Sequence, residues 1–394
     1  MNDIRTSAWR GVMTGRDPGE EHRASTPLEL LFDLCFVVAV SQAAAQLHHS
    51  LGEGHAGAGV LGYAMVFFAI WWAWMNFTWF ASSYDTDDVP YRLLTLLQMA
   101  GVLVLAAGVS DALDHYDFTL ITVGYVIMRV AMVVQWARAS REDPARRGTA
   151  LRYAAGIAAV QVGWVVRLAL PHPFDYAGFA LLVVAELAVP IWAESRGPSV
   201  TPWHPGHIAE RYGLFTIIVL GEVILATLTG IRSAVSEHGL SVSLGLIAGG
   251  ALLLVFALWW IYFTGSEAQF PTLRTALTWG YGHYVVFAAV AGLGAGLEAA
   301  VGAAEHHGHL SPEHAAWAVA VPAAVYLLVL AVLHRVGGTA PQGPPIPAVA
   351  GAVALLVLAA LAGPLGLGGA ILGMGLTVTA VLAGYLITDR RARA

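Results

Sequence analysis

The sequence predicts an all-α integral membrane protein with about twelve transmembrane helices and both termini in the cytoplasm. Of its 394 residues, 57% are apolar and only 12% are charged, and the mean hydropathy is +0.66. Soluble domains carry roughly twice that charged fraction. The apolar residues gather in runs long enough to cross a bilayer, and the basic residues concentrate in every second loop. These three observations predict the fold class.

Each apolar run has about 18 to 26 residues, and a helix of that length spans the ~30 Å hydrocarbon layer of a membrane. The runs fall near 28–49, 59–81, 91–111, 119–138, 149–170, 174–193, 208–231, 241–264, 276–301, 314–335, 346–363 and 368–388. Only Gly363 and Pro364 separate the last two runs, which makes this the least distinct boundary of the series.

All of the basic residues are arginines, and their positions test the helix count. With the N-terminus inside, seventeen of the twenty fall in predicted inner loops and tails, whereas Arg167 and Arg232 lie near outer span ends and Arg129 lies within a span. Such an excess on the inner side orients membrane proteins, and an odd number of spans would break it. Residues 1–24 hold four of these arginines and no apolar core, so we expect a cytoplasmic tail and no signal peptide.

The composition also excludes several classes of function. The chain has no lysine, so it cannot hold retinal or another carbonyl compound as a Schiff base. The net charge of −6 is spread over loops and termini, and we therefore expect no nucleic-acid partner. No nucleotide-binding loop, HExxH, GxSxG or CxxC motif occurs, so we expect no cofactor and no enzyme of these types. The expected partners are membrane lipids, a proton or cation with or without a small solute, and a second copy in a homodimer.

A shift of the chain by 181 residues aligns its two halves without a gap over some eighty positions. Glu29 then falls on Glu210, Trp79 on Trp260, and Pro90 on Pro271. This alignment predicts two parallel six-helix repeats, at 25–200 and 201–394, related by an axis along the membrane normal. Transporters built from parallel repeats place their site between the halves. The alternative is a duplicated scaffold without a central pathway.

Two segments resemble the signatures of a known family. Residues 28–37, LELLFDLCFV, are similar to the ELFFDLVFV motif of the bacterial low temperature requirement protein A (LtrA) family, with Leu31 and Cys35 as departures. Residues 207–215, HIAERYGLF, followed by LGE at 220–222, resemble the second motif of that family, H-x-x-E-R-x-G-L-F…LGE. The tryptophan-rich second span, which ends in DTDD at 85–88, also fits. The resemblance implies a multi-pass protein of the bacterial inner membrane, and it implies no settled biochemical activity.

Ionisable side chains within spans cost roughly 2.5–3.5 kcal/mol on insertion scales, so they are candidates for function. Glu29 and Asp33 lie four residues apart on one helix face, where two like charges favour uptake of a proton by one of them. Glu29 has a structural alternative, because Thr26, Pro27 and Glu29 read as a capping box at the start of the helix. Asp33 has no capping role and is the better candidate.

Three further charges are predicted to lie within the apolar layer. Glu222 and Glu186 are candidate ion-binding groups, and Arg129 is the internal counter-charge. The alternative is that Arg129 forms a structural ion pair with one of these two acids. Even then the acids remain in excess, which favours protons or cations over anions.

Other candidates lie nearer to the predicted membrane surfaces. Glu210 and Arg211 begin the seventh span, and Arg92 and Arg274 are candidate partners for them, so with Glu29 these residues form a predicted inner gate. The structural alternative is that these residues form an ion pair at the membrane interface and have no gating role. His283 can change its charge near neutral pH, although a lone histidine on an apolar face is more often a packing residue. The cluster of His306, His307 and His309 is a weak candidate metal site, with a solvated loop as the alternative.

We therefore expect a secondary carrier for a proton or cation, in which Asp33, Glu222 and Glu186 bind the ion. A cation channel is one alternative, because a continuous polar pore needs the same residue types. A lipid-handling protein or intramembrane enzyme linked to cold adaptation is another, and it would require an opening toward lipid. A sensory or scaffold protein, in which the acids only hold helices together, is the last.

Overall fold

The computed structural model describes residues 9–20, 23–195, 200–264, 270–305, 310–338 and 345–393. All regular secondary structure within these ranges is helical. The elements are α1 (Pro27–Gly52), α2 (Ala56–Tyr84), α3 (Val89–Ala107), α4 (Val109–Asp114), α5 (Thr119–Glu142), η1 (Pro144–Arg146), α6 (Arg147–Arg167), α7 (Phe174–Ser195), α8 (Pro205–His238), α9 (Val242–Tyr262), α10 (Leu273–Ala304), α11 (Pro312–Val336), α12 (Ile346–Ala360), α13 (Ala362–Leu365) and α14 (Leu367–Arg393).

Each of the twelve predicted spans falls on one of these helices. Eleven helices in the described ranges are long and apolar enough to cross a membrane, so the chain is a multi-pass membrane protein. The helix on the run near 346–363 differs, because α12 has only 15 residues and covers ~22 Å. The short α13 follows it and contains Gly363 and Pro364. The total of twelve spans thus stays a prediction.

Local sequence signals explain where several helices begin. The predicted capping box is confirmed at α1, where the Thr26 amide donates to the Glu29 carboxylate at 2.8 Å and the Glu29 amide donates to the Thr26 hydroxyl at 3.3 Å. Asp88, Ser241 and Ser311 likewise accept a backbone N–H in the first turn of α3, α9 and α11.

The chain divides into two compact units. Unit 1 comprises residues 1–39 and 68–208, and unit 2 comprises residues 40–67 and 209–394. The boundary between the units divides α1 and α2 near their middles, and it leaves only the first turn of α8 in unit 1. The predicted repeats, 25–200 and 201–394, place residues 40–67 in the first half instead. The repeat itself stays a prediction.

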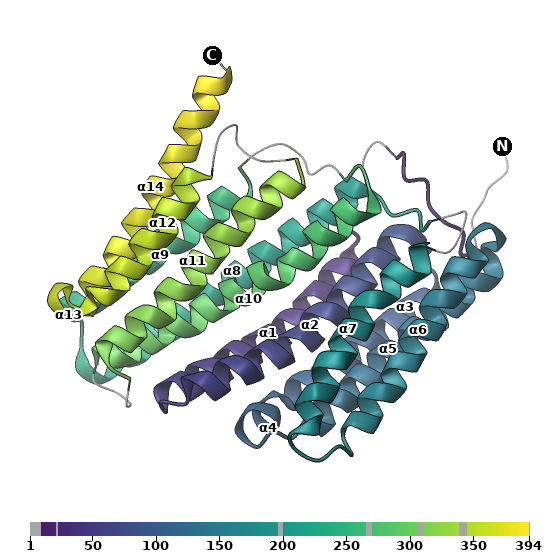
Figure 1. Ribbon diagram of the computed structural model, residues 1–394, viewed down its shortest axis with the longest axis horizontal. Coiled ribbons are helices and arrows are strands. Elements are labelled where there is room, and N and C mark those ends of the chain that lie inside the picture. The colour runs from purple at the N-terminus through teal and green to yellow at the C-terminus, as the bar shows by residue number, and fades with distance from the viewer. Residues whose placement is uncertain are drawn as a thin grey trace. The chain divides into compact units, whose positions relative to one another are not determined.

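Unit 1 is built from antiparallel neighbours. The helices α3 and α5, α5 and α6, and α6 and α7 pack against one another, as Figure 1 shows. Glycines allow the backbones of α3 and α5 to touch, because a Cβ on Gly124 would lie 2.5 Å from the carbonyl oxygen of Gly101. Close backbone approach at small residues is a common basis of helix packing in membranes.

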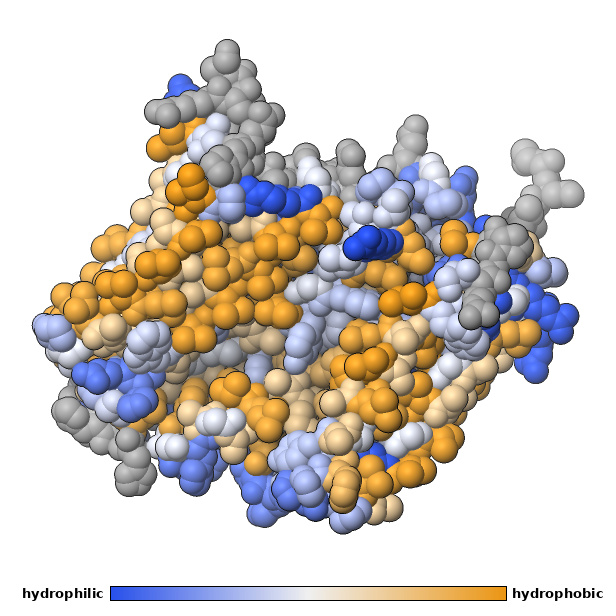
Figure 2. Space-filling model, viewed as in Figure 1, coloured by the Kyte–Doolittle hydropathy of each residue, from blue (hydrophilic) through white to orange (hydrophobic). Residues whose placement is uncertain are grey.

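In unit 2, helices also pack with their backbones in close contact at glycines. Its main neighbours are α10 with α11, α9 with α14, and α11 with α12. A Cβ on Gly296 would lie 2.2 Å from the Ala318 carbonyl oxygen, and one on Gly250 would lie 2.5 Å from that of Ile371. Figure 2 shows an almost continuous apolar surface over α11, α12 and α14. Outward-facing side chains there include Val321, Leu328, Val332, Val349, Val353, Val357 and Leu376. Lipid is the solvent that suits such a surface.

Gly124→Val tests the contact between α3 and α5. The added side chain has to push the two backbones apart, and we expect a loss of about 2 kcal/mol or more in the free energy of unfolding, measured by denaturation in detergent. Gly57→Ala in α2 is the control, because nothing lies within 4 Å of its added Cβ. Equal stability of both variants would contradict the close packing.

Candidate functional site

The Glu186 carboxylate lies at the centre of a buried polar cluster in unit 1. It accepts hydrogen bonds from Trp72 Nε1 at 2.8 Å, from the Tyr125 hydroxyl at 2.8 Å and from Trp164 Nε1 at 3.2 Å. Arg129 Nη2 lies 3.4 Å from the same carboxylate, and its guanidinium also donates to the Tyr125 hydroxyl. The donors come from α2, α5 and α6, and the acid comes from α7.

This geometry matches the structural alternative for Arg129 and Glu186. Both side chains are almost fully buried, at 2% and 1% exposure, and their opposite charges compensate each other. A carboxylate with one cation and three further donors has its acceptor capacity filled. The network therefore joins four helices of unit 1 through one buried carboxylate.

Asp33 is also buried in unit 1. Its carboxylate accepts a hydrogen bond from Trp74 Nε1 of α2 at 2.7 Å. Near it, Phe32 stacks on Phe77 with ring centroids 3.9 Å apart. Aromatic side chains of α2 thus surround the start of α1. The tryptophan-rich second span supplies this packing and two of the indole donors that hold buried acids.

Glu29 joins the two family-like motifs. Besides capping α1, its carboxylate lies 3.1 Å from His207 Nε2, and both side chains are fully buried. His207 opens the second motif and Glu29 belongs to the first, although the chain separates them by most of unit 1. His207 was quoted in the motif without a role, because sequence spacing does not reveal which residue it meets.

The other members of the predicted inner gate have different surroundings. Arg92 pairs instead with Asp87, at 2.6 Å, in an exposed position. Arg274 is exposed at the start of α10, whereas Arg211 is fully buried in α8 and Glu210 is half-buried. The gate as a set of five residues stays a prediction.

His283 is held as a packing residue in unit 2. Its Nδ1 hydrogen-bonds the carbonyl oxygen of Trp279 at 2.8 Å, and its Nε2 hydrogen-bonds the Tyr262 hydroxyl at 3.0 Å. The rings of Tyr212 and Phe287 lie against it. Both ring nitrogens form hydrogen bonds, which favours the interpretation of His283 as a packing residue.

Glu222 has a different environment, in the middle of α8 in unit 2. Ser41 of α1 donates its hydroxyl proton to the Glu222 carboxylate at 2.5 Å. The side chain is half-buried, and in the described residues neither an arginine nor a histidine forms an ion pair with it. Glu222 interacts electrostatically with a second acid, Glu298 of α10.

Glu298 in turn lies beside His48 of α1, with Nδ1 and a carboxylate oxygen 3.7 Å apart. Ser41 and His48 are seven residues apart and share a face of α1, so this face presents polar groups to both acids. Sequence reasoning missed Glu298, although an acid within the predicted span at 276–301 is a signal for function. No motif or spacing in the sequence pairs His48 with this acid.

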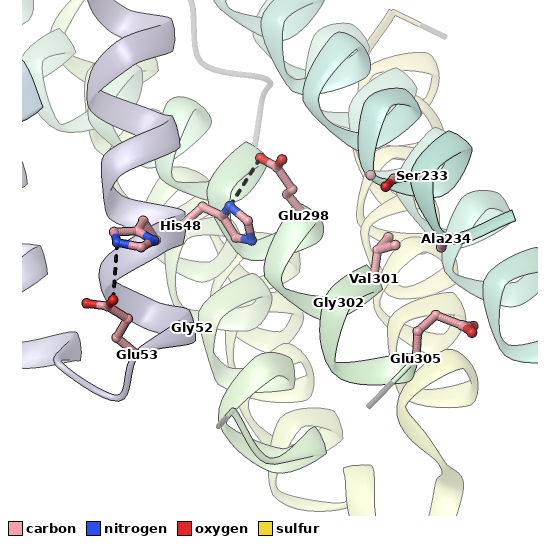
Figure 3. A pocket seen from close by; sticks show the side chains of 11 residues that line it. His48, Gly52, Glu53, Ser233, Ala234, Glu298, Val301, Gly302 and Glu305 are labelled. Atoms are coloured by element: carbon pink, nitrogen blue, oxygen red, sulfur yellow. Dashed lines mark ion pairs between the residues drawn. The ribbon is translucent and has the colours of Figure 1, made fainter. Parts of the chain in front are cut away.

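His48 and Glu298 line an open pocket of about 440 Å³ between the ends of α1, α8 and α10. Figure 3 shows His48 and Glu298 together with Glu53 and Glu305, and His49 also lines the pocket. Pockets of ~300–1,000 Å³ are typical of small-molecule sites. Glu222 lies eight residues before the pocket residue Gly230, or ~12 Å along α8. The pair of His48 and Glu298 therefore lies at this opening, and Glu222 is within electrostatic range of Glu298.

The predicted metal cluster of His306, His307 and His309 lies outside the described residues. Within the described ranges, no group of three or more histidine, cysteine, aspartate or glutamate side chains is arranged to hold a metal ion.

A second group of charges lies at the C-terminal end of α2, outside the membrane-spanning helices. Arg23 Nη2 lies 3.8 Å from Asp85, and Glu29 is near enough to interact with both. Burial and then the nearby Glu29 raise the pKa of Asp85 from 3.8 to about 6, although Arg23 opposes the change. Burial likewise lowers the pKa of Arg23.

A family model described as the bacterial low temperature requirement A protein (LtrA) matches residues 24–383. This match confirms the resemblance that the two motifs predicted. The chain is also similar to "Uncharacterized protein RA0937" of Rhizobium meliloti (strain 1021), with 31% identity over 266 residues. The similar region covers 64% of this chain and 60% of that protein, so less than two thirds of the relative's length is matched.

A double-mutant cycle tests the ion pair in unit 1. Arg129→Met leaves the Glu186 charge buried without its cation, and we expect a loss of about 3–5 kcal/mol in the free energy of unfolding. The double variant with Glu186→Met should lose less than the sum of the single changes, because it leaves no unpaired charge. Arg92→Met, which breaks an exposed pair, is the control and should change little. Additive losses would contradict a direct pair.

Asp85→Asn tests the buried acid at the end of α2. A carboxyl group with a pKa of about 6 in the folded protein and 3.8 in the unfolded chain destabilises the fold above pH 6, and this cost disappears as the pH falls toward 4. The variant should therefore be more stable than the parent by about 1–3 kcal/mol at pH 7.5 and equal to it near pH 4. Thermal unfolding across this pH range measures the difference, with Asp87→Asn as the exposed control. A constant difference at all pH values would refute the assignment.

Proposed function

Because the chain belongs to the bacterial low temperature requirement A family and is a multi-pass helical membrane protein, we propose that it is a secondary carrier that moves a proton or a cation across the bacterial cytoplasmic membrane. A small solute travels with the ion or is exchanged for it. The observation that supports this proposal most is the pair Glu222 and Glu298 beside an open, water-accessible pocket in unit 2.

The contrast with unit 1 supports assigning the ion to these two acids. Glu186 has an arginine and three other donors, and Asp33 is enclosed among aromatic side chains. Glu222 instead accepts one hydrogen bond from the neutral hydroxyl of Ser41. The charged group next to it, Glu298, is also an acid and adds a second negative charge. A carboxylate in this position gains more from an incoming cation than one that is already neutralised. We therefore propose Glu222 as the binding group and regard Glu186 and Arg129 as structural.

The pocket supplies the route to this group. With the N-terminus inside, α1 ends on the outer side, and the pocket at its end then opens to the external medium. A proton taken up at the pair of His48 and Glu298 would pass to Glu222, which lies deeper along α8. Release to the cytoplasm requires a second conformation in which Glu222 is accessible from the inner side.

The same proposal includes twelve spans in two parallel six-helix repeats, with both termini inside. The arginine distribution supports this orientation, and an even number of spans is needed to keep it. In this arrangement α12 and α13 together would form the eleventh crossing, although α12 alone is short. Cysteine labelling from each side of the membrane would place the termini and the pocket independently of flux.

Flux in proteoliposomes with an entrapped pH-sensitive dye tests the ion assignment. We expect Glu222→Gln to lower proton or cation flux by at least tenfold, because the neutral amide cannot take up the charge. Glu298→Gln should slow the flux and change its dependence on external pH, since the group that meets the pocket is then neutral.

Glu313→Gln at the start of α11 is the matched control, because it removes the same charge from the same predicted side of the membrane and should leave flux unchanged. Folded Glu222→Gln and Glu298→Gln proteins with parental flux would rule out the proposed site. If the protein produced single-channel currents in a planar bilayer, it would be a cation channel and the assignment as a carrier would be wrong.

A further inference from the structure

The segment that precedes α1 is bound to the C-terminal end of α2. The last carbonyl groups of a helix have no partner within the helix. Here the Arg16 amide donates to the carbonyl oxygen of Ser83 at 3.0 Å, and Arg23 Nη2 donates to that of Ala81 at 2.7 Å. The Arg23 guanidinium also donates to the carbonyl oxygen of Ser82. A cation at this position also complements the negative end of the helix dipole.

A second set of bonds joins the backbone of this segment to the carboxylates at the ends of α3 and α5. The amide of Gly11 donates to Asp88 at 2.8 Å, and that of Met13 donates to Glu142 at 2.6 Å. The amide of Gly15 donates to the Asp143 carboxylate at 3.2 Å. Every second residue from 11 to 15 therefore faces an acid, as expected for an extended segment laid across a row of acceptors.

Arg138 connects the acceptors to one another. It pairs with Asp88 at 2.5 Å and with Glu142 at 3.2 Å, and it donates to the Gly11 carbonyl oxygen at 2.8 Å. The bonds to Arg138, to the Tyr91 amide and to the Gly11 amide hold the pKa of Asp88 down, near 2. The carboxylate thus stays charged and able to accept these bonds throughout the physiological pH range.

The segment has many polar bonds and few apolar anchors. The Met13 side chain is fully buried, whereas Trp9 and Val12 are exposed at 76% and 69%. Segments with little buried apolar area and hydrogen bonds near solvent are the ones that open locally at a small cost in free energy. Beneath the segment lie Arg23 and Asp85, and next to them is the buried pair of Glu29 and His207.

We propose that residues 11–20 and Arg23 form a latch that reversibly closes this end of unit 1 and that its release admits water to Asp85 and to the pair of Glu29 and His207. The latch is closed in this structure. If the chain carries ions as proposed above, the closed latch is autoinhibitory, because it seals the predicted cytoplasmic end of α1. The closure itself does not depend on that function.

The charges around Asp85 give the latch a pH dependence. Asp85 interacts with Arg23, Glu29, Asp87 and Arg92. Arg16 and Tyr91 interact with Arg23, and His207 pairs with Glu29. Burial and the charge of Glu29 raise the pKa of Asp85 to about 6, although Arg23 opposes the change. Because Asp85 takes up a proton more readily in the closed arrangement than in water, protonation stabilises closure, and the latch should be tighter at pH 5.5 than at pH 7.5.

Labelling of a single cysteine measures the closure directly. In a Cys35→Ser background, Ser83→Cys places a thiol at a buried position of α2 whose backbone carbonyl accepts the Arg16 amide. We expect slow reaction with a membrane-impermeant maleimide in the purified full-length protein. Gly15→Val should speed labelling at least tenfold, because its Cβ would lie 2.7 Å from both Arg146 Nη1 and Pro202 Cγ.

Arg23→Gln and Gly11→Pro release the latch by other means, through the lost cation and the lost N–H, and should act like Gly15→Val. Thr14→Val, on an exposed side chain of the same segment, is the control and should label at the parental rate. Circular dichroism confirms that each variant is folded. Equal labelling rates in the parent and all three folded release variants would overturn the proposal.

Flux separates this proposal from the previous one. If both hold, the release variants raise ion flux in proteoliposomes. If the carrier assignment fails, no variant shows flux while the labelling differences persist. If the latch fails, the labelling rates are equal while Glu222→Gln still removes flux.

Discussion

The structure depends on one constraint, which is the high cost of a charged group without a partner inside lipid. The acids in the helices meet this constraint in different ways. Glu186 has a buried arginine, Glu29 has a buried histidine, and Asp33 has an indole N–H. Their partners come from helices distant in the sequence, so each acid also fixes how the helices of unit 1 pack. The polar interior of unit 1 is therefore a framework.

Unit 2 satisfies the same constraint less completely. Ser41 gives Glu222 a hydrogen bond without a compensating charge, and the neighbouring Glu298 adds a second negative group. His48 compensates one of these charges only when it is protonated. The local charge therefore changes with proton uptake, and the pocket beside it provides the water from which a proton would come. Because the acids of unit 2 are compensated less completely than those of unit 1, we assign the proposed ion binding to unit 2 and a structural role to the acids of unit 1.

The helices were predictable because apolar runs of sufficient length have few alternatives in a membrane. Every predicted span falls on a helix, and the capping box at Thr26 and Glu29 was readable from four residues. The short α12 departs from the expected length, because the helix ends at Ala360 and the chain is interrupted at Leu361 before α13 begins. Composition does not show where such a run stops being helical.

The partners of the charged residues were not predictable in the same way. The sequence offered Glu186 and Glu222 equally as partners for Arg129, and only the packing of α5, α6 and α7 selects Glu186. The Glu29–His207 pair joins residues far apart in the chain, and no local spacing indicates it. Glu298 was missed for another reason, since the motifs drew attention to the acids that they contain. A systematic list of every ionisable residue within a predicted span would have included it.

The same constraint explains why α1 is the helix on which the proposed functions meet. Its first half holds Glu29 and Asp33 in unit 1, and its second half presents Ser41 and His48 to the acids of unit 2. α1 is a continuous helix from Pro27 to Gly52, so one element carries both sets of groups. The latch binds directly before this helix, through Arg23, three residues ahead of the capping Thr26. Closure and ion binding therefore involve side chains of the same helix, and any coupling between the two proposed functions would have to act through it.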